Sequence, residues 1–182
     1  MDLVEALSSL ELNDALHEAR LLVLLLAFAG ADGQGEIEGL TKLAKLDFLL
    51  RYPALLERAL VARRANPKGA AVEMHERDSV ESRMVRYRFG PWDHRYRKFL
   101  NQLVARGLTT TRVEGRKITI GLTDEGRRVA AQIAEAQSFA AIVARAKVLK
   151  SHLDLTASNL MRFVYETFPE LTSLRMNEQI PT

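Results

Sequence analysis

The chain has 182 residues, a net charge of +3 and no cysteine. Without cysteine it has no disulfide, no thiolate metal site and no cysteine nucleophile, which fits a reducing cytoplasm. The length suits one domain with an extension. The longest apolar run, residues 21–29, is far too short to cross a bilayer, and the acidic N-terminus lacks the pattern of a secretory signal. We therefore expect a cytoplasmic protein with no membrane segment.

The small net charge conceals an uneven distribution along the chain. Residues 1–81 contain nine Lys and Arg against fourteen Asp and Glu, whereas residues 82–128 contain twelve against four. Residues 129–182 contain five of each kind. The middle segment, with a net charge of +8, is therefore a candidate contact surface for a polyanion or an acidic protein. The alternative is a basic face that contacts only solvent.

The N-terminal part predicts one apolar helix between less regular segments. Residues 1–14 are expected to form an arm, with Asn13 or Asp14 as the N-cap of the helix that follows. That helix becomes apolar nearly all round, as expected for the centre of a core or an interface. His17 is expected on its surface. Three glycines within residues 30–36 predict a loop.

The next segment predicts two helices joined at a sharp break. Apolar residues recur at helical spacing from residue 37 to residue 50, and Pro53 then suits the first position of a new helix. Such a pair resembles a helix-turn-helix unit. Residues 65–83 are polar and lack periodicity, which predicts an exposed, mobile loop.

Residues 84–128 predict strand, helix, hairpin and the start of another helix. Alternating residues over 84–90 indicate a half-buried strand that ends at Gly90-Pro91. Asp93 suits the N-cap of the following helix, and Gly107 suits its end. The β-branched residues over 109–123 predict a β-hairpin that turns at Glu114-Gly115.

The remaining chain predicts three helices. Thr123 or Asp124 is expected to cap the first, and two more are expected from residue 138 and from residue 158. The chain is thus predicted to be mainly helical, α+β, with a winged-helix or helix-turn-helix core, a small β-hairpin wing and flanking helices. We expect an arm over 1–14, a winged-helix domain over 15–136 and a helical extension over 137–182.

A winged helix suggests contact with double-stranded DNA. The N-terminal residues of a recognition helix approach base edges in the major groove, and a wing contacts phosphates or the minor groove. Arg pairs well with guanine, and Asn or Gln with adenine. The candidate DNA contacts are Arg86, Arg88, His94, Arg95, Lys98, Asn101, Gln102, Arg112, Arg116 and Lys117.

Catalytic signatures are absent from the sequence. It contains no GxSxG, no HExxH and no Walker A pattern, and its four histidines are scattered. We therefore expect a non-enzymatic protein without a cofactor or a bound metal. An enzyme whose catalytic residues meet only in space is the alternative.

Three stretches together resemble the small middle-component proteins of bacterial three-component defence systems built around an SMC-like ABC ATPase. They are GLTKLAKLDFLLRYP (39–53), VRYRFGPWDHRYRKFLNQLVARGL (85–108) and YETFPEL (165–171), and the resemblance covers most of the chain. The resemblance implies a non-enzymatic subunit that bridges the ATPase and an effector close to DNA. It carries over no catalytic residue.

The leading hypothesis is therefore a winged-helix adaptor in an SMC-like anti-phage complex that contacts DNA through its basic face. The alternative is a free-standing transcriptional regulator, which is expected to dimerise through residues 127–150 and bind a palindromic site. Winged helices also dock onto proteins, so a basic face that meets an acidic protein stays open as well.

Overall fold

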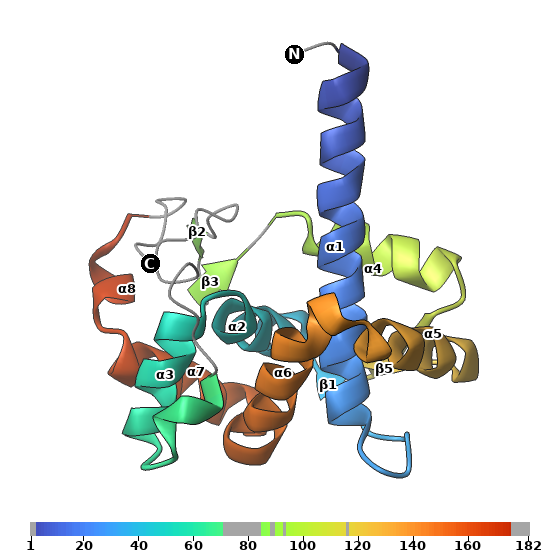
Figure 1. The fold of residues 1–182 in the computed structure, drawn as a ribbon. Helices are drawn as coiled ribbons and strands as arrows, with labels where there is room; N and C mark the ends of the chain where they lie inside the picture. The colour runs from blue at the N-terminus through green and yellow to red at the C-terminus, as the bar shows by residue number, and fades with distance from the viewer. Residues whose placement is uncertain (1–2, 71–84, 88–89, 93, 116, 176–182) are drawn as a thin grey trace.

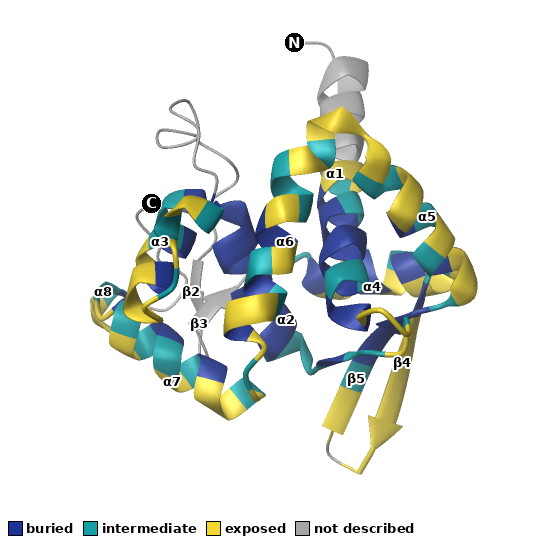
Figure 2. Cartoon of the chain, turned by 60° about the horizontal axis from the view of Figure 1, so that its bottom comes forward, coloured by how far each residue is buried: buried dark blue, intermediate teal, exposed yellow. Residues whose placement is uncertain are grey.

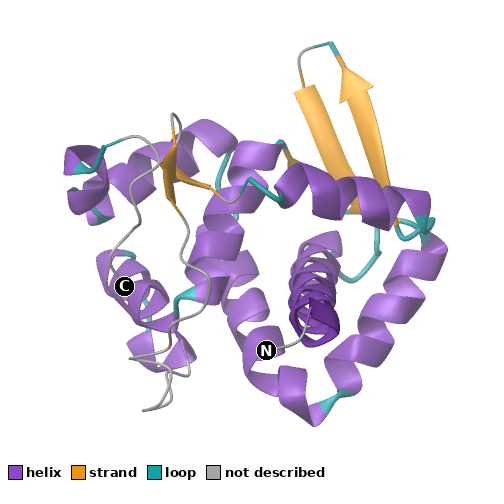
Figure 3. Ribbon diagram, turned by 90° about the horizontal axis from the view of Figure 1, so that it is seen from above, coloured by secondary structure: helices purple, strands orange, loops and turns teal. Residues whose placement is uncertain are grey.

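The computed structural model describes residues 3–70, 85–87, 90–92, 94–115 and 117–175. Helices dominate these residues, and two small antiparallel sheets complete a mainly helical α+β fold (Figure 3). In chain order the elements are α1 (Leu3–Ala29), β1 (Ile37–Glu38), α2 (Leu40–Arg51), α3 (Pro53–Ala62), η1 (Pro67–Ala70), β2 (Val85–Tyr87), β3 (Gly90–Trp92), α4 (Tyr96–Ala105), β4 (Thr109–Glu114), β5 (Lys117–Leu122), α5 (Asp124–Glu135), η3 (Gln137–Phe139), α6 (Ala140–Leu153), α7 (Ala157–Thr167) and α8 (Glu170–Ser173).

Helix α1 is the axis around which the other elements pack. Its C-terminal half is buried, with Leu24 and Phe28 almost fully enclosed, and it contacts α4, α5, α6 and β5. Its N-terminal turns extend beyond the rest of the fold (Figure 1). Because α1 begins at Leu3, the prediction of an arm over 1–14 capped at Asn13 or Asp14 is wrong. Strong helix formers such as leucine and alanine precede Asn13 and continue the helix through it.

A three-stranded sheet in the order β1–β5–β4 lies against α1 and α4. Ile37 pairs with Ile120, and the β4–β5 ladder runs without interruption from Thr109 opposite Leu122 to Glu114 opposite Lys117. The predicted hairpin is confirmed, and it projects from the helical body (Figure 3). The short β1 strand was not predicted, because residues 37 and 38 fit the helical spacing that α2 continues.

A second antiparallel pair, β2 with β3, lies beside α2. It corrects the prediction of one strand over 84–90: the strand ends at Tyr87, and Gly90-Pro91 begins its partner rather than ending it. Proline has no N–H to donate, so it suits a short edge strand of this kind. Of the loop predicted over 65–83, residues 67–70 form a 3-10 helix, and residues 71–83 lie outside the described parts.

Helices α2, α3, α6 and α7 form the other side of the molecule. Nearly all of α2 is buried, and the ring of Phe48 meets those of Tyr52 and Phe168 edge-on, with centroids 5.5 and 5.9 Å away. The predicted break at Pro53 is confirmed, as are the helices that follow residues 123, 137 and 156. Thr123 caps α5 by accepting a hydrogen bond from the Gly126 amide at 2.8 Å.

No helix among the described residues is long and apolar enough to span a membrane.

Candidate nucleic-acid interface

Helix α4 presents one apolar side to the core and one polar side to solvent. Tyr96, Phe99, Leu100 and Leu103 are buried, whereas Arg97, Lys98 and Asn101 are exposed. The buried residues recur at helical spacing, which fixes the rotation of the helix against α1. The exposed side of α4 and the β4–β5 hairpin together carry most of the predicted DNA contacts, and we call them the basic face.

A buried ionic network holds α4 in place against α1 and α2. Asp47 is completely buried on α2 and accepts hydrogen bonds from Arg20 Nε at 2.7 Å, Arg51 Nη2 at 3.1 Å and the Tyr96 hydroxyl at 2.6 Å. Burial by itself would raise the pKa of Asp47, but the charges of Arg20 and Arg51 outweigh it and hold that pKa well below its usual value. Asp47 therefore stays ionised and joins three helices at one point.

Tyr96 begins α4 and completes the network. Burial raises its pKa well above the usual value, and the neighbouring Asp47 carboxylate raises it further. The hydroxyl therefore keeps its proton and donates a hydrogen bond to the Asp47 carboxylate. This bond positions the first turn of α4, which carries the candidate DNA contact Lys98.

His17 is buried at the α1–α4 contact, which corrects the prediction that it lies on the surface. It is only 2% exposed, and its ring stacks on Phe99 with centroids 5.4 Å apart. Arg95 Nη2 lies 3.0 Å from its Nε2 atom, and Arg20 approaches its other ring nitrogen. Burial lowers the pKa of His17 to about 3, and the nearby arginines lower it in the same direction. The ring is therefore neutral at physiological pH.

Three cations in and around α4 are paired with acids of α1. Lys98 Nζ lies 2.5 Å from an oxygen of Asp14, and Arg95 lies 3.4 Å from the other oxygen of the same carboxylate. Arg106, just after α4, pairs with Glu18 at 2.6 Å. These acids lie one helical turn apart, so they form one stripe on α1 that faces α4.

The cations of the hairpin are paired with acids at the two ends of β1, Glu36 just before it and Glu38 as its last residue. Arg112 bonds Glu36, and Lys117 lies 3.4 Å from Glu38. The side chains of Arg112 and Lys117 remain 63% and 68% exposed. Hydrogen bonding to Glu36 raises the pKa of Arg112, which stays positive. The basic face is therefore largely balanced by acids of the N-terminal half.

The residues predicted to contact DNA differ in their position and exposure in the structure. Lys98, Asn101, Arg112 and Lys117 are exposed on the basic face, as predicted. His94 precedes α4, and Arg95 turns towards His17 and Asp14. Gln102 is half-buried, and its side-chain oxygen has no hydrogen-bond partner among the described residues. Arg88 and Arg116 lie outside the described residues, as does the predicted N-cap Asp93, and Arg86 is described only as part of the β2 backbone.

The sequence analysis missed two sets of residues that shape this face. One is the buried Asp47 network, whose members lie far apart in the chain and carry no motif. The other is the set of pairing acids: Asp14, Glu18, Glu36 and Glu38. A signal for the second set was present, since residues 1–81 carry the negative excess that the basic segment lacks. Arg97, which was not predicted, is exposed with no ion pair among the described residues.

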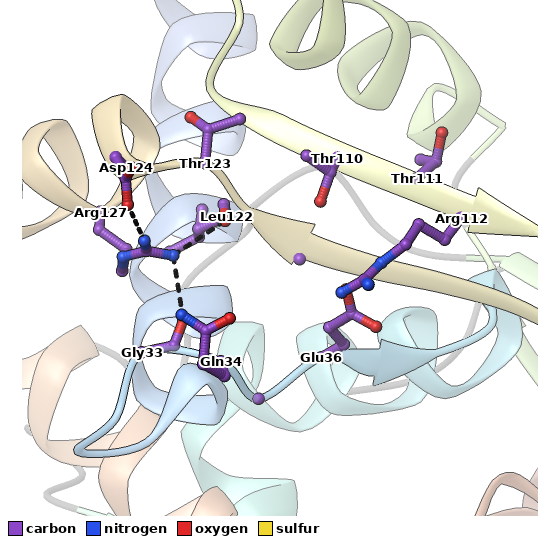
Figure 4. Close-up of a pocket in the computed structure, with 12 residues that line it drawn as sticks. Gly33, Gln34, Glu36, Thr110, Thr111, Arg112, Leu122, Thr123, Asp124 and Arg127 are labelled. Carbon is purple, nitrogen blue, oxygen red and sulfur yellow. Dashed lines mark hydrogen bonds and ion pairs between the residues drawn. The ribbon is translucent and has the colours of Figure 1, made fainter.

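A hollow of about 660 Å³ lies beside the hairpin, between the α1–β1 loop, both strands and the start of α5 (Figure 4). Arg127 enters it and donates to the carbonyl oxygens of Gly33 at 3.0 Å and Leu122 at 3.1 Å, while it also pairs with Asp124. Arg112 and Glu36 face each other across the other end (Figure 4). Both guanidinium groups already pair with carboxylates, so the hollow carries no excess positive charge that would bind an anion. Its two arginines instead connect separate segments of the chain.

Side chains suited to metal binding do not cluster in the described part of the chain. No three or more His, Asp or Glu side chains come close enough there to hold a metal ion. Lys45 is buried, its Nζ donates to the Thr41 carbonyl at 3.2 Å, and burial lowers its pKa to about 8. A single lysine on a packed helix lacks the base and the substrate cavity that a nucleophile requires.

No family model matches the chain, and no curated protein or solved structure is significantly similar to it.

Proposed function

We propose that this chain is a non-catalytic winged-helix subunit that contacts double-stranded DNA through its basic face. One observation carries the proposal: the element order α1, β1, α2, α4, β4, β5 combined with the sheet order β1–β5–β4. A winged helix has this order of helices and strands, with the third helix as the DNA reader and the hairpin as the wing. In this assignment α3, η1 and the β2–β3 pair are an insertion between the second and third helices.

The cations on the exposed side of α4 and on the hairpin support a contact with phosphates. Arg97, Lys98 and Asn101 are exposed on α4, and Arg112 and Lys117 are exposed on the hairpin. The hairpin projects from the body of the fold (Figure 2). Exposed ion pairs are worth only about 0–1 kcal/mol, so a phosphate can replace a carboxylate partner at little cost. On binding DNA, the paired cations of the basic face thus exchange their carboxylate partners for phosphates of the duplex.

The adaptor role extends this proposal. The resemblance to middle components of SMC-like systems supports it, together with the helices α6 and α7 that lie outside the winged-helix elements. In that role the chain bridges a coiled-coil ATPase and an effector. Co-expression with the products of adjacent genes tests it: we expect co-elution with a long coiled-coil ATPase, and a chain that always elutes alone contradicts the adaptor role.

The DNA contact is tested by fluorescence anisotropy with a labelled duplex over a range of salt concentrations. If about five cations meet phosphates, the slope of log K against log salt is about −4 to −5. The double variant Arg97→Ala, Lys98→Ala is expected to weaken binding and make the slope shallower by about 2. The matched control is Lys147→Ala, Arg162→Ala, which removes two exposed cations from α6 and α7. Equal losses in both variants contradict a specific role for α4.

A further inference from the structure

Strand β4 forms an open edge of the three-stranded sheet. Its only neighbour among the described elements is β5, and every residue after Thr109 is exposed. The ladder with β5 contains no bulge, and the strand contains no proline. Figures 2 and 3 show the hairpin projecting from the body. An exposed edge of this kind is a template for pairing with another strand.

The register identifies the backbone groups on the open edge. The Thr123 amide donates to the Leu108 carbonyl, so this pair is hydrogen-bonded across the hairpin. Because hydrogen-bonded pairs alternate along an antiparallel ladder, Thr110, Arg112 and Glu114 bond to β5. The N–H and C=O groups of Thr111 and Val113 therefore point outward. Among the described residues nothing accepts or donates a hydrogen bond there.

We propose that β4 pairs antiparallel with β4 of a second copy of this chain, with a two-fold axis at Val113. Only outward-facing residues bond across such an interface, which leaves three symmetric registers along the strand. A register centred on Thr111 needs Thr109, which is 3% exposed and covered. A register centred on Arg112 places the two Arg112 side chains opposite each other, and like charges in that position are unfavourable.

The register centred on Val113 matches the charges. It sets Arg112, which bonds Glu36 of its own chain, opposite Glu114 of the second copy, and Glu114 opposite the second Arg112. Two cross-strand contacts between opposite charges result. Within the described residues of one copy, Glu114 forms no ion pair, so it is available for this contact. Charge complementarity therefore selects one register.

The same register covers the most exposed large apolar side chain described. Val113 is 70% exposed, and Ile118, opposite it on β5 and on the same face of the sheet, is 41% exposed. At the two-fold axis each Val113 meets its copy, and the two Ile118 side chains flank the pair. An apolar cluster at a hairpin end is costly in water and is removed by this pairing.

Sedimentation velocity of the full chain over a wide range of protein concentration tests the proposal. A short strand pair buries little area, so we expect a weak dimer that appears as concentration rises. Glu114→Lys and Arg112→Glu each place like charges opposite each other, and each is expected to weaken association by about tenfold. Mixed together, they restore both ion pairs, so a heterodimer forms from two chains that stay monomeric alone. Glu135→Lys is the matched control, since it makes the same charge change on exposed α5.

Val113→Asp is a second variant, which places two carboxylates at the two-fold axis. The melting temperature of each variant is measured to check that it folds. A wild-type chain that stays monomeric at every concentration overturns the proposal. So does a dimer that Glu114→Lys leaves intact, because the interface then lies elsewhere. A mixture of the two charge variants that stays monomeric overturns this register. None of these outcomes depends on DNA binding, because sedimentation is measured on the protein without DNA.

Discussion

Two regions of this molecule are held by ion pairs that differ greatly in their exposure to solvent. At the junction of α1, α2 and α4, Asp47 meets Arg20 and Arg51, and the Asp47 and Arg51 side chains are shielded from solvent. On the basic face, Asp14 meets Lys98, whose side chain is 56% exposed. In both regions a carboxylate meets a cation from a distant part of the chain, Arg20 for Asp47 and Lys98 for Asp14. Water reaches only the second.

The difference in exposure gives the two sets of ion pairs different consequences. A buried carboxylate cannot lose its cations without leaving unpaired charge in a poorly solvating interior. An exposed carboxylate gives up its cation to another anion at a cost of about 1 kcal/mol or less. We therefore infer that the Asp47 network fixes the orientation of α4, and that the pairs of the basic face regulate what α4 binds.

Asp47→Asn is expected to have the largest effect on stability. The substitution keeps the size of the side chain but leaves Arg20 and Arg51 without their buried counter-charge. Breaking one partner of a buried ion pair typically costs about 3–5 kcal/mol. Urea denaturation measures the loss in the free energy of unfolding.

The matched exposed variant is Glu38→Gln, which removes the partner of Lys117. Its effect on the free energy of unfolding is expected to stay within about 0.5 kcal/mol. Similar losses in Asp47→Asn and Glu38→Gln contradict the distinction between the two regions.

Acid pH is expected to weaken the same junction in two stages. The pKa of His17 is lowered from 6.5 to about 3 in the folded chain, so between these values the unfolded chain binds a proton that the folded chain does not. Stability is therefore complete above about pH 6.5 and falls as the pH decreases towards 3. Asp47 also has a lowered pKa, so its contribution is lost only below its ordinary value of 3.8.

His17→Gln separates the two stages. Without the imidazole, the free energy of unfolding is expected to lose most of its pH dependence between about 6 and about 4.5 and to keep the decline below that range. Urea denaturation at a series of pH values measures it. An unchanged pH profile in His17→Gln means that His17 gains a proton without opposing folding.

The sequence predicts local structure here better than it predicts pairings. Gly107, with φ of 69°, ends α4, Gly115, with φ of 63°, turns the hairpin, and Thr123 caps α5. Each of these signals depends on the residue itself and its near neighbours. The start of α1 was missed because a good capping residue, Asn13, lies inside a segment of strong helix formers.

The basic face shows the limit of counting charge along the chain. The charge distribution predicts where the cations lie, and the exposed Lys98 and Arg112 confirm part of it. It does not predict that Asp14 and Glu36 return to them, because those contacts depend on how α1 and β1 pack against later elements. His17 was misplaced for the same reason, since α4 covers a side of α1 that looks polar in sequence.

Asp14→Asn is expected to have a small effect on stability and the most informative effect on binding. The Asp14 carboxylate holds both Lys98 and Arg95, so it competes with a phosphate for the α4 cations. Its removal is expected to change the free energy of unfolding by less than about 1 kcal/mol and to tighten duplex DNA binding about two- to fivefold. Fluorescence anisotropy at fixed salt measures the gain.

Asp124→Asn is the control for the overall charge. It removes an exposed carboxylate that pairs with Arg127 of α5 and not with a cation of α4. If both variants tighten binding equally, the gain reflects net charge alone, and the acids of α1 do not screen α4 specifically. If Asp14→Asn weakens binding, the carboxylate positions Lys98 and Arg95 for the duplex rather than competing with it. A gain restricted to Asp14→Asn means that the exposed ion pairs of this molecule set the threshold that a DNA partner must exceed.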